Sequence, residues 1–583
     1  MTNSYFDKQS SQGLTVKVWR GERMCLLGMN VDKPSADFVG FAIEVKEPGA
    51  ADFTPLNNRL AFSYDKPLKQ AVTGGRWYSS LTAPFQKFRW IHFPDMHKTG
   101  VYTYRITQMH MPSDNALTKG ASVTCAITLD PIVYDGFLDV GFTRNFASSQ
   151  AYADNFGNNT DIIPAKAAGG LAFKKSNTDA YTWLGFEAYQ MISDLLDEVD
   201  KDESLSLDVF AYDFNEPDIL DALLKLKSRL RIVIDNSGDH AAKASAESQA
   251  AALLAKSAGA DNVKRMQFIR LQHNKVLIVK KGNAPQKVLF GSTNFSFRGL
   301  YIQANNALCV YAPQAADYFE SVFQLAFDNA GKPPKGWFVT NAIAKKWYPV
   351  NLPGKPGLQF CFSPHADSNL SMAPVGKAIS AAKSSVFFSI AFLYQTPTGP
   401  VRSAINKLMG SKVFSYGISD KLGGLKVYKP DGSIGLVDFA YLAQNAPQPF
   451  KQEWSGGAGI HQHDKFVVTD FSLPTATVFT GSSNLAPGGE EANGDNLVMI
   501  KDPRVATSYA IEALRIFDHL HFRVKMESAF GKPGKAKKTG KGSVALQALT
   551  LQKPTTLSGK AAWFAGFYQK SSDQQTDRLL FST

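Results

Sequence analysis

Short apolar runs and amphipathic stretches alternate between about residue 135 and residue 525. Residues 205–213 and 230–235 are apolar and rich in β-branched side chains, and residues 218–230 between them have helical spacing. The same order of strand, helix and strand returns at residues 385–418. A strand, a helix and a second strand parallel to the first form one β-α-β unit. The pattern therefore predicts two α/β units in one chain.

The first 134 residues have a different pattern. Four runs of β-forming residues lie between Gly and Pro turn signals, at residues 14–18, 41–45, 101–106 and 121–127. Strands at such intervals predict an antiparallel β-sandwich of the immunoglobulin or fibronectin type. We expect a structural or substrate-orienting module, and a role in binding lipid or a partner stays open.

Two of the predicted strands in the α/β region begin with a His-x-Lys motif. These motifs are His273-x-Lys275 and His463-x-Lys465. Because side chains alternate along a strand, the His and the Lys of each motif point to the same face. The two motifs are 190 residues apart, and a repeat of this length predicts two halves that face each other. The same shift relates Gly291, Ser292, Asn294 and Asn306 to Gly481, Ser482, Asn484 and Asn496.

At these residues the chain resembles the phospholipase D superfamily, whose signature is His-x-Lys-x4-Asp, then Gly-Ser and an Asn two residues after the Ser. The second copy matches in full through Asp470, whereas the first copy has Lys280 at that place. The resemblance implies a pseudo-two-fold pair of α/β/α halves with the active site at their interface. The expected fold class is therefore α/β, with an all-β sandwich domain in front. The resemblance also implies that the motif Asp is mainly structural, and the odd spacing from Lys275 should turn Lys280 to the opposite face.

These residue types suit phosphodiester chemistry. Negative charge collects on the non-bridging oxygens in the transition state, so preorganised donors lower the barrier. Lys275 and Lys465 supply positive charge. One histidine can attack phosphorus to form a phosphohistidine, and the other can protonate the leaving alkoxide and later activate water, which requires no metal and no cofactor. Further phosphate-binding hydrogen bonds are expected from Ser292, Asn294, Ser482 and Asn484.

The repeat aligns Asn305 with Asp495, and this difference suggests which histidine has which role. In the family, a carboxylate at this place often orients the histidine. A nearby carboxylate favours the charged imidazolium, whereas a neutral amide does not. We therefore expect His463 to meet Asp495 and act as the general acid. His273 is then expected beside Asn305 as the nucleophile.

Composition narrows the class of protein only slightly. The formal charge of +12 suits nucleic acid, anionic lipid or plain solubility. The four cysteines are too few and too scattered for a disulfide framework or a zinc cluster. The first residues contain no apolar h-region, so no signal sequence is expected, and the sequence has no apolar run of about twenty residues. We expect a soluble, cytoplasmic monomer without a transmembrane segment, and export without a signal stays open.

The expected domains follow from these patterns. The β-sandwich takes residues 1–134, the first repeat 135–335 and the second repeat 355–525. A Lys- and Gly-rich linker is expected at 526–542, and the aromatic tail at 543–583 should pack on the catalytic core.

The sequence leaves the substrate open. Phe392, Tyr394 and Trp454 place aromatic side chains near the expected cleft, which favours hydrolysis of phospholipid headgroups and is compatible with a peripheral contact with an anionic membrane surface. A DNA or RNA endonuclease of the same superfamily is the alternative. The departures at Lys280 and Asn305 also allow a catalytically silent module that binds a phosphate ligand. His461 forms a His-x-His pattern with His463, but no further metal ligands converge there in the sequence.

Overall fold

The computed structural model of the chain describes residues 5–64, 77–130, 134, 136–145, 150–157, 171, 178–333, 336–409, 411–421, 424–430, 434–438, 462–530 and 550–583. Trp454 and His461 lie outside these residues, as does most of the predicted linker at 526–542.

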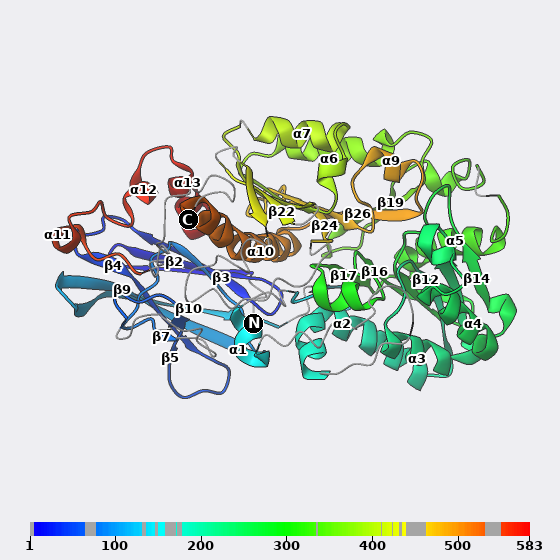
Figure 1. Cartoon of the computed structure of the whole chain (residues 1–583), viewed down its shortest axis with the longest axis horizontal. Coiled ribbons are helices and arrows are strands. Elements are labelled where there is room, and N and C mark those ends of the chain that lie inside the picture. Colours follow the sequence, from blue (N-terminus) through cyan, green and yellow to red (C-terminus); the bar gives the residue numbers. More distant parts are fainter. Residues whose placement is uncertain are drawn as a thin grey trace, which may run out of the picture.

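The N-terminal region contains two four-stranded antiparallel sheets that share one apolar core (Figure 1). All four strands predicted here are present, as β2, β4, β9 and β10. The immunoglobulin or fibronectin type stays a prediction. The first sheet contains β1 (Phe6–Ser11), β2 (Leu14–Arg20), β3 (Cys25–Val31) and β8 (Arg89–His92), and the second contains β10 (Ala116–Thr128), β9 (Val101–Ser113), β4 (Phe38–Lys46) and β5 (Thr54–Pro55). A two-stranded sheet is formed by β6 (Asn57–Asn58) and β7 (Tyr78–Ser79).

A seven-stranded mixed sheet forms the first α/β half. The predicted β-α-β unit is present, because β12 and β13 pair in parallel and helix α3 joins them. Helices α2, α3 and α4 contribute to a core on one face of the sheet, and α5 contributes to a core on the other. In spatial order the strands are β11 (Leu138–Phe142), β17 (Asn306–Val310), β16 (Ala284–Gly291), β15 (Val276–Lys281), β12 (Leu205–Ala211), β13 (Leu230–Asp235) and β14 (Val263–Met266). The helices are α1 (Gln150–Phe156), α2 (Thr178–Lys201), α3 (Pro217–Lys225), α4 (Ala246–Ala258) and α5 (Pro313–Asp328).

A nine-stranded sheet forms the second half and repeats this order. The run β19-β26-β25-β24-β20-β21 corresponds to β11-β17-β16-β15-β12-β13 of the first half. In spatial order its strands are β18 (Tyr348–Val350), β19 (Gly357–Ser363), β26 (Asp495–Lys501), β25 (Thr477–Gly481), β24 (Lys465–Thr469), β20 (Ser385–Ile390), β21 (Phe414–Lys421), β22 (Gly424–Tyr428) and β23 (Ile434–Asp438). The helices are α6 (Asn369–Ala381), α7 (Pro400–Leu408), α9 (Pro487–Glu490) and α10 (Pro503–Phe530).

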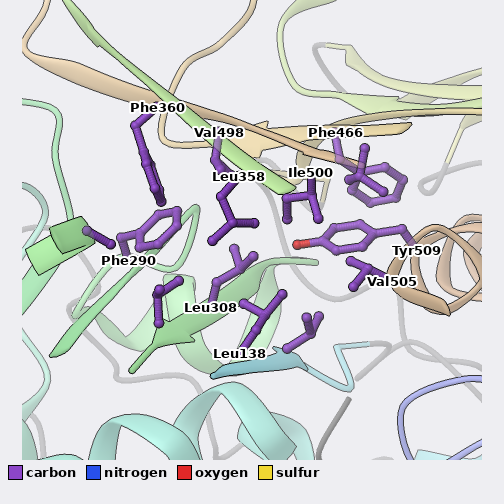
Figure 2. Close-up of a cluster of buried hydrophobic side chains, with 14 of the residues drawn as sticks. Leu138, Phe290, Leu308, Leu358, Phe360, Phe466, Val498, Ile500, Val505 and Tyr509 are labelled. Atoms are coloured by element: carbon purple, nitrogen blue, oxygen red, sulfur yellow. The ribbon is translucent and has the colours of Figure 1, made fainter. Parts of the chain in front are cut away.

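One apolar core lies between the two sheets (Figure 2). It joins Leu308 of β17 and Phe290 of β16 to Phe360 of β19 and Val498 of β26, and α10 adds Tyr509. Alternate residues of each central strand face this shared core, and the others face the outer helices. The halves are thus joined by buried apolar surface as well as by polar contacts. Among the described residues, no helix combines the length and the apolar character needed to cross a membrane.

The C-terminal tail lies mainly on the N-terminal sheets. Helices α12 (Ala565–Tyr568) and α13 (Asp573–Ser582) follow α11 (Thr555–Ser558), and α13 packs on β3 and β2. Trp563 and Phe567 pack against the N-terminal core, whereas Phe581 reaches the core shared by the two halves. The tail therefore reaches the second half through α13, where Asp577 also accepts the Tyr416 hydroxyl of β21 at 3.0 Å. The aromatic side chains before α13 pack on the N-terminal sheets.

Candidate active site

The motif residues gather at one edge of the two sheets because the central strands are neighbours. His273 and Lys275 directly precede β15, and Lys465 begins β24 two residues after His463. The adjacent strands β16 and β25 each end at the Gly of a Gly-Ser pair. The next strand of each sheet begins at a histidine partner: β17 begins directly after Asn305, and β26 begins at Asp495. The fold thus brings the residues separated in sequence to one place.

The backbones of the two halves exchange equivalent bonds at this edge. The His273 amide donates to the Gly494 carbonyl at 2.9 Å, and the His463 amide donates to the Ala304 carbonyl at 3.1 Å. Each bond belongs to a short parallel bridge. Residues 273 and 304 differ from 463 and 494 by the same shift of 190, so the two contacts are reciprocal. The candidate site therefore needs both halves.

The histidine partners are crossed relative to the prediction. Nδ1 of His273 donates to Oδ1 of Asp495 at 2.7 Å, and Nδ1 of His463 donates to Oδ1 of Asn305 at 2.9 Å. The expectation that His463 meets Asp495 is wrong, because each histidine receives its partner from the opposite half. The sequence alignment of the repeats shows which residues are equivalent, but not which half supplies the contact.

The two serines hold these histidine partners. Ser292 donates to Oδ1 of Asn305 at 2.8 Å, and Ser482 donates to Oδ1 of Asp495 at 2.7 Å. Each hydroxyl also accepts a backbone amide, from Asn306 or Asn496, at 3.0 Å. The hydroxyl hydrogens are already used, so neither serine can donate to a phosphate in this arrangement. The serines therefore position the histidine partners, and their contact with phosphate stays a prediction.

The glycine before each serine has a steric reason. Gly291 and Gly481 have φ values of 154° and 144°, which side chains rarely adopt. A Cβ at either position would lie 2.4 Å from the carbonyl oxygen of Asn306 or Asn496. Glycine therefore allows the two strands to approach closely enough for the serine hydroxyl to bond to Asn305 or Asp495.

The lysines and histidines are buried and act on one another electrostatically. Lys465 Nζ donates to the His463 carbonyl at 2.6 Å, and Lys275 makes the equivalent contact with the His273 carbonyl. Burial lowers the pKa of Lys275 to about 7. Burial and the charge of Lys275 bring the pKa of Lys465 well below its usual range. Burial and Lys275 lower the pKa of His273 to about 4, and burial and both lysines lower the pKa of His463 strongly. The site therefore favours an anion that would offset this positive charge.

Asp495 is the ionised carboxylate beside His273 and Lys275. Burial raises its pKa, but His273, Lys275 and the Ser482 hydroxyl outweigh burial and lower the pKa to about 2. Asn305 has no charge, but its amide orientation is fixed because Nδ2 donates to the Gly299 carbonyl at 2.8 Å. The two histidines therefore sit in equivalent geometry with different electrostatics.

The predicted asparagines Asn294 and Asn484 each lie two residues after the serine of a Gly-Ser pair. Their Oδ1 atoms are buried and have no hydrogen-bond partner among the described residues. An amide that has no protein partner for its oxygen costs stability unless a ligand or water supplies one. Both residues stay candidates for substrate contacts.

Several positioning residues were missed from the sequence. Asn496 Nδ2 donates to Asn274 Oδ1 at 2.8 Å, and Asn306 Nδ2 lies 3.5 Å from Asp464 Oδ1 in the equivalent contact. Gln272 Nε2 donates to the Ala211 carbonyl at 3.1 Å. The shift of 190 relates the two asparagine contacts and also Gln272 to Gln462, whose Nε2 instead bonds to the Ser389 hydroxyl. Extending the alignment outward from the motifs could have found these residues.

Aromatic rings flank both histidines. Tyr212 contacts His273 edge-on at 4.7 Å between ring centroids, and Phe392 contacts His463 edge-on at 6.3 Å. Of the predicted cleft aromatics, Phe392 is therefore at the site and Tyr394 lies two residues beyond it, half-buried.

The motif Asp and its replacement have different surroundings. Asp470 Oδ1 accepts the backbone amides of Ser384 at 2.7 Å and Lys383 at 2.9 Å, where β20 begins. Lys280 instead forms an ion pair with Asp208 Oδ2 at 2.5 Å and contacts Glu320 Oε1 at 3.3 Å. It lies on the face of β15 opposite to the motif residues, as predicted, because Val276 and Ile278 face the shared core whereas Leu277 and Val279 face the outer one.

One family model matches part of the first half. Residues 201–326, which contain the first motif, match the family model described as "Cardiolipin synthase, PLD-like domain". The resemblance to the phospholipase D superfamily is thereby confirmed. A search of curated protein sequences finds no match.

Solved structures give more distant similarities. Phosphatidylserine synthase from Haemophilus influenzae is 13% identical, with 57% of this chain and 84% of that chain covered and a TM-score of 0.40. Nuc, a phospholipase D family member from Salmonella typhimurium, is 27% identical, with 24% and 88% covered and a TM-score of 0.20. Polyphosphate kinase from Porphyromonas gingivalis is 10% identical, with 57% of this chain covered and a TM-score of 0.34, and the chain spans 48% of its length.

Proposed function

We propose that this protein is a phosphodiesterase that acts through a phosphohistidine on His273, with His463 as the general acid and base. The observation that carries the proposal is the crossed pair of contacts, His273 with Asp495 and His463 with Asn305. They present two imidazoles from two halves in one buried, cationic site. A supporting finding is that residues 201–326 match a PLD-like domain.

The partner of each histidine assigns its role. If charge alone decided, His273 would be the general acid, because Asp495 contacts His273 and not His463. However, the Asp495 carboxylate accepts Nδ1–H of His273, so the Nε2 lone pair of a neutral His273 is free to attack phosphorus. The same carboxylate stabilises the positive imidazole ring that forms on attack. His463 has only the amide of Asn305, so its imidazolium is less stabilised and gives up its proton more readily.

The negative charge of the substrate is needed for His463 to be protonated. Burial and the two lysines lower the pKa of His463, which disfavours its protonated form in the free site. A phosphodiester carries one negative charge, and its entry beside His463 raises the pKa of the imidazole and favours protonation. In the first step the P–Nε2 bond of His273 forms, the bond from phosphorus to the leaving oxygen breaks, and that oxygen takes the proton of His463. In the second step water attacks phosphorus, His463 takes its proton, and the P–N bond breaks.

For the substrate we propose a phospholipid headgroup ester. One ground is that the description of the matched family model names cardiolipin synthase. The other is that Phe392 places an apolar ring beside His463. A nucleic-acid phosphodiester is the alternative, because a formal charge of +12 suits a polyanion equally well. We expect a monomer that needs no cofactor.

The test is a paired turnover assay in EDTA with the wild-type chain and His463→Ala. Each is given phospholipid vesicles and, separately, plasmid and single-stranded nucleic acid. Headgroup release that disappears in the variant supports the phospholipase, and nicking that disappears supports the nuclease. Phosphate-ester binding without turnover on any substrate would contradict the enzyme and leave a binding module.

A further inference from the structure

A group of metal-ligating side chains lies beside the candidate active site in the first half, and among the described residues the second half has no such group. Asp213 follows β12, His240 lies in the short 3-10 turn after β13, and Glu247 is in the first turn of α4. One ligand atom from each lies within 4.8 Å of the other two. We propose that these three side chains bind one divalent transition-metal ion, with Zn²⁺ as the best match for one imidazole and two carboxylates.

A buried carboxylate behind the group prepares His240 as a ligand. Asp235 is fully buried, and its Oδ2 accepts Nδ1–H of His240 at 2.8 Å. The same oxygen is held by the amide and hydroxyl of Ser237, at 3.0 and 2.6 Å. This contact leaves Nε2 to face the two other ligands, as in the carboxylate–histidine–metal arrangement of many protein sites. Nε2 lies 3.7 Å from Glu247 Oε1, beyond hydrogen-bonding distance.

The two carboxylates are also positioned from outside the group. Glu247 Oε1 accepts the Phe214 amide at 3.0 Å, and Asp213 Oδ2 accepts the Ser296 hydroxyl at 2.8 Å. Both contacts can persist with a metal bound, because a carboxylate oxygen has two lone pairs. Metal–ligand bonds of about 2.0–2.2 Å place neighbouring ligand atoms ~3.3–3.5 Å apart, so His240 and Glu247 are already close to this spacing and Asp213 completes it by moving inward by up to about 1.5 Å. The His240 side chain retains 19% exposure, which gives an ion access.

The group is connected to the candidate active site through Tyr212. Its ring contacts His240 edge-on at 4.8 Å and His273 edge-on at 4.7 Å, and Lys275 Nζ lies 4.5 Å from its centre. Asp235 also accepts the backbone amide of Gln272, the residue before His273, at 2.7 Å. The second half has Phe392 beside its histidine and Leu393 next in the chain, so it has no carboxylate at the place of Asp213.

An occupied site would act on Lys275. Burial lowers the pKa of this lysine, while the charges of Asp213 and Asp235 raise it. A dication beside these carboxylates offsets their charge, so Lys275 becomes easier to deprotonate and binds a phosphate less well. We therefore expect the bound ion to slow turnover at neutral pH. This effect rests on the proposed function, whereas the binding itself does not.

The test measures binding separately from turnover. The full chain is freed of metal with EDTA, and Zn²⁺ binding is followed by calorimetry and Mn²⁺ binding by electron paramagnetic resonance. The expected result is one ion per chain, with binding at least 10-fold weaker in both Asp213→Asn and His240→Gln. Circular dichroism checks that each variant is folded, and either variant alone can test the site if the other is not.

Two control variants locate the ion. His463→Ala removes a histidine of the candidate active site, and His110→Gln removes a histidine that pairs with Asp37 at 3.2 Å in the N-terminal region. Both should bind the ion as the wild type does. The proposal is overturned if neither ion binds at one per chain, if Asp213→Asn and His240→Gln bind normally, or if His463→Ala abolishes binding. If binding occurs as expected but no substrate is turned over, the metal site stands and the proposed function fails.

Discussion

The two halves of the candidate active site use one hydrogen-bonding scheme with different charges. Each histidine bonds to a side chain of the opposite half, and a serine of that opposite half bonds to the same side chain. The side chain is a carboxylate at Asp495 and an amide at Asn305, which have nearly the same shape. The repeat therefore determines where the groups lie, and in the proposed mechanism the difference between Asp495 and Asn305 decides which histidine attacks and which transfers protons.

The largest expected effect separates the two histidines. With a p-nitrophenyl phosphodiester, the leaving group is acidic enough to depart without protonation. His463→Ala should therefore complete the first step and stop at the phosphohistidine on His273, because no base activates water. Steady turnover should fall by about 10²–10⁴-fold, the usual contribution of a general acid and base. A burst of p-nitrophenol and an added mass on the intact chain at alkaline pH would measure this result.

His273→Ala is the matched variant. It should give neither a burst nor added mass, because the nucleophile is missing. An adduct that maps to His463 in this variant would reverse the roles of the two halves.

A smaller effect is expected when the halves are made alike. Asn305→Asp places a carboxylate against His463, which favours the imidazolium and raises its pKa. A general acid with a higher pKa stays protonated to higher pH, so the basic limb of the profile of kcat/KM against pH should move upward by about one unit. The opposite exchange, Asp495→Asn, should lower kcat about 10–100-fold, because a neutral amide no longer stabilises the positive ring that forms on His273. An unchanged basic limb in folded Asn305→Asp would contradict the role of His463.

The sequence was sufficient for some of these features and not for others. The apolar runs gave the β-α-β units, and the constant shift gave the motif residues, because both are local patterns or repeats of them. The crossed partners were not predictable in this way, since the contact of His273 with Asp495 joins residues 222 apart and depends on how the halves face each other. The positioning role of the serine hydroxyls was missed for the same reason, because their bonds to Asn305 and Asp495 appear only after folding.

The smallest expected effects concern the position where the motif Asp is replaced. Asp470→Ala removes the acceptor of the Lys383 and Ser384 amides, so buried donors lose their partner and the free energy of unfolding should fall by about 3 kcal/mol. Lys280→Ala should cost only about 1 kcal/mol, because Asp208 keeps its ion pair with Arg231 at 2.6 Å.

The neighbouring Glu320 limits the cost at Lys280 further. Burial and Asp208 raise the pKa of Glu320 to about 7, so loss of Lys280 is offset when Glu320 takes up a proton. Lys280→Asp restores the family residue but places a third carboxylate beside Asp208 and Glu320, with Arg231 as their shared cation, so it should destabilise the chain more than Lys280→Ala does. Urea unfolding midpoints would rank the three variants. A Lys280→Asp chain more stable than the wild type, or a Lys280→Ala chain that folds but loses turnover, would show that the first half depends on this position for more than its ion pairs.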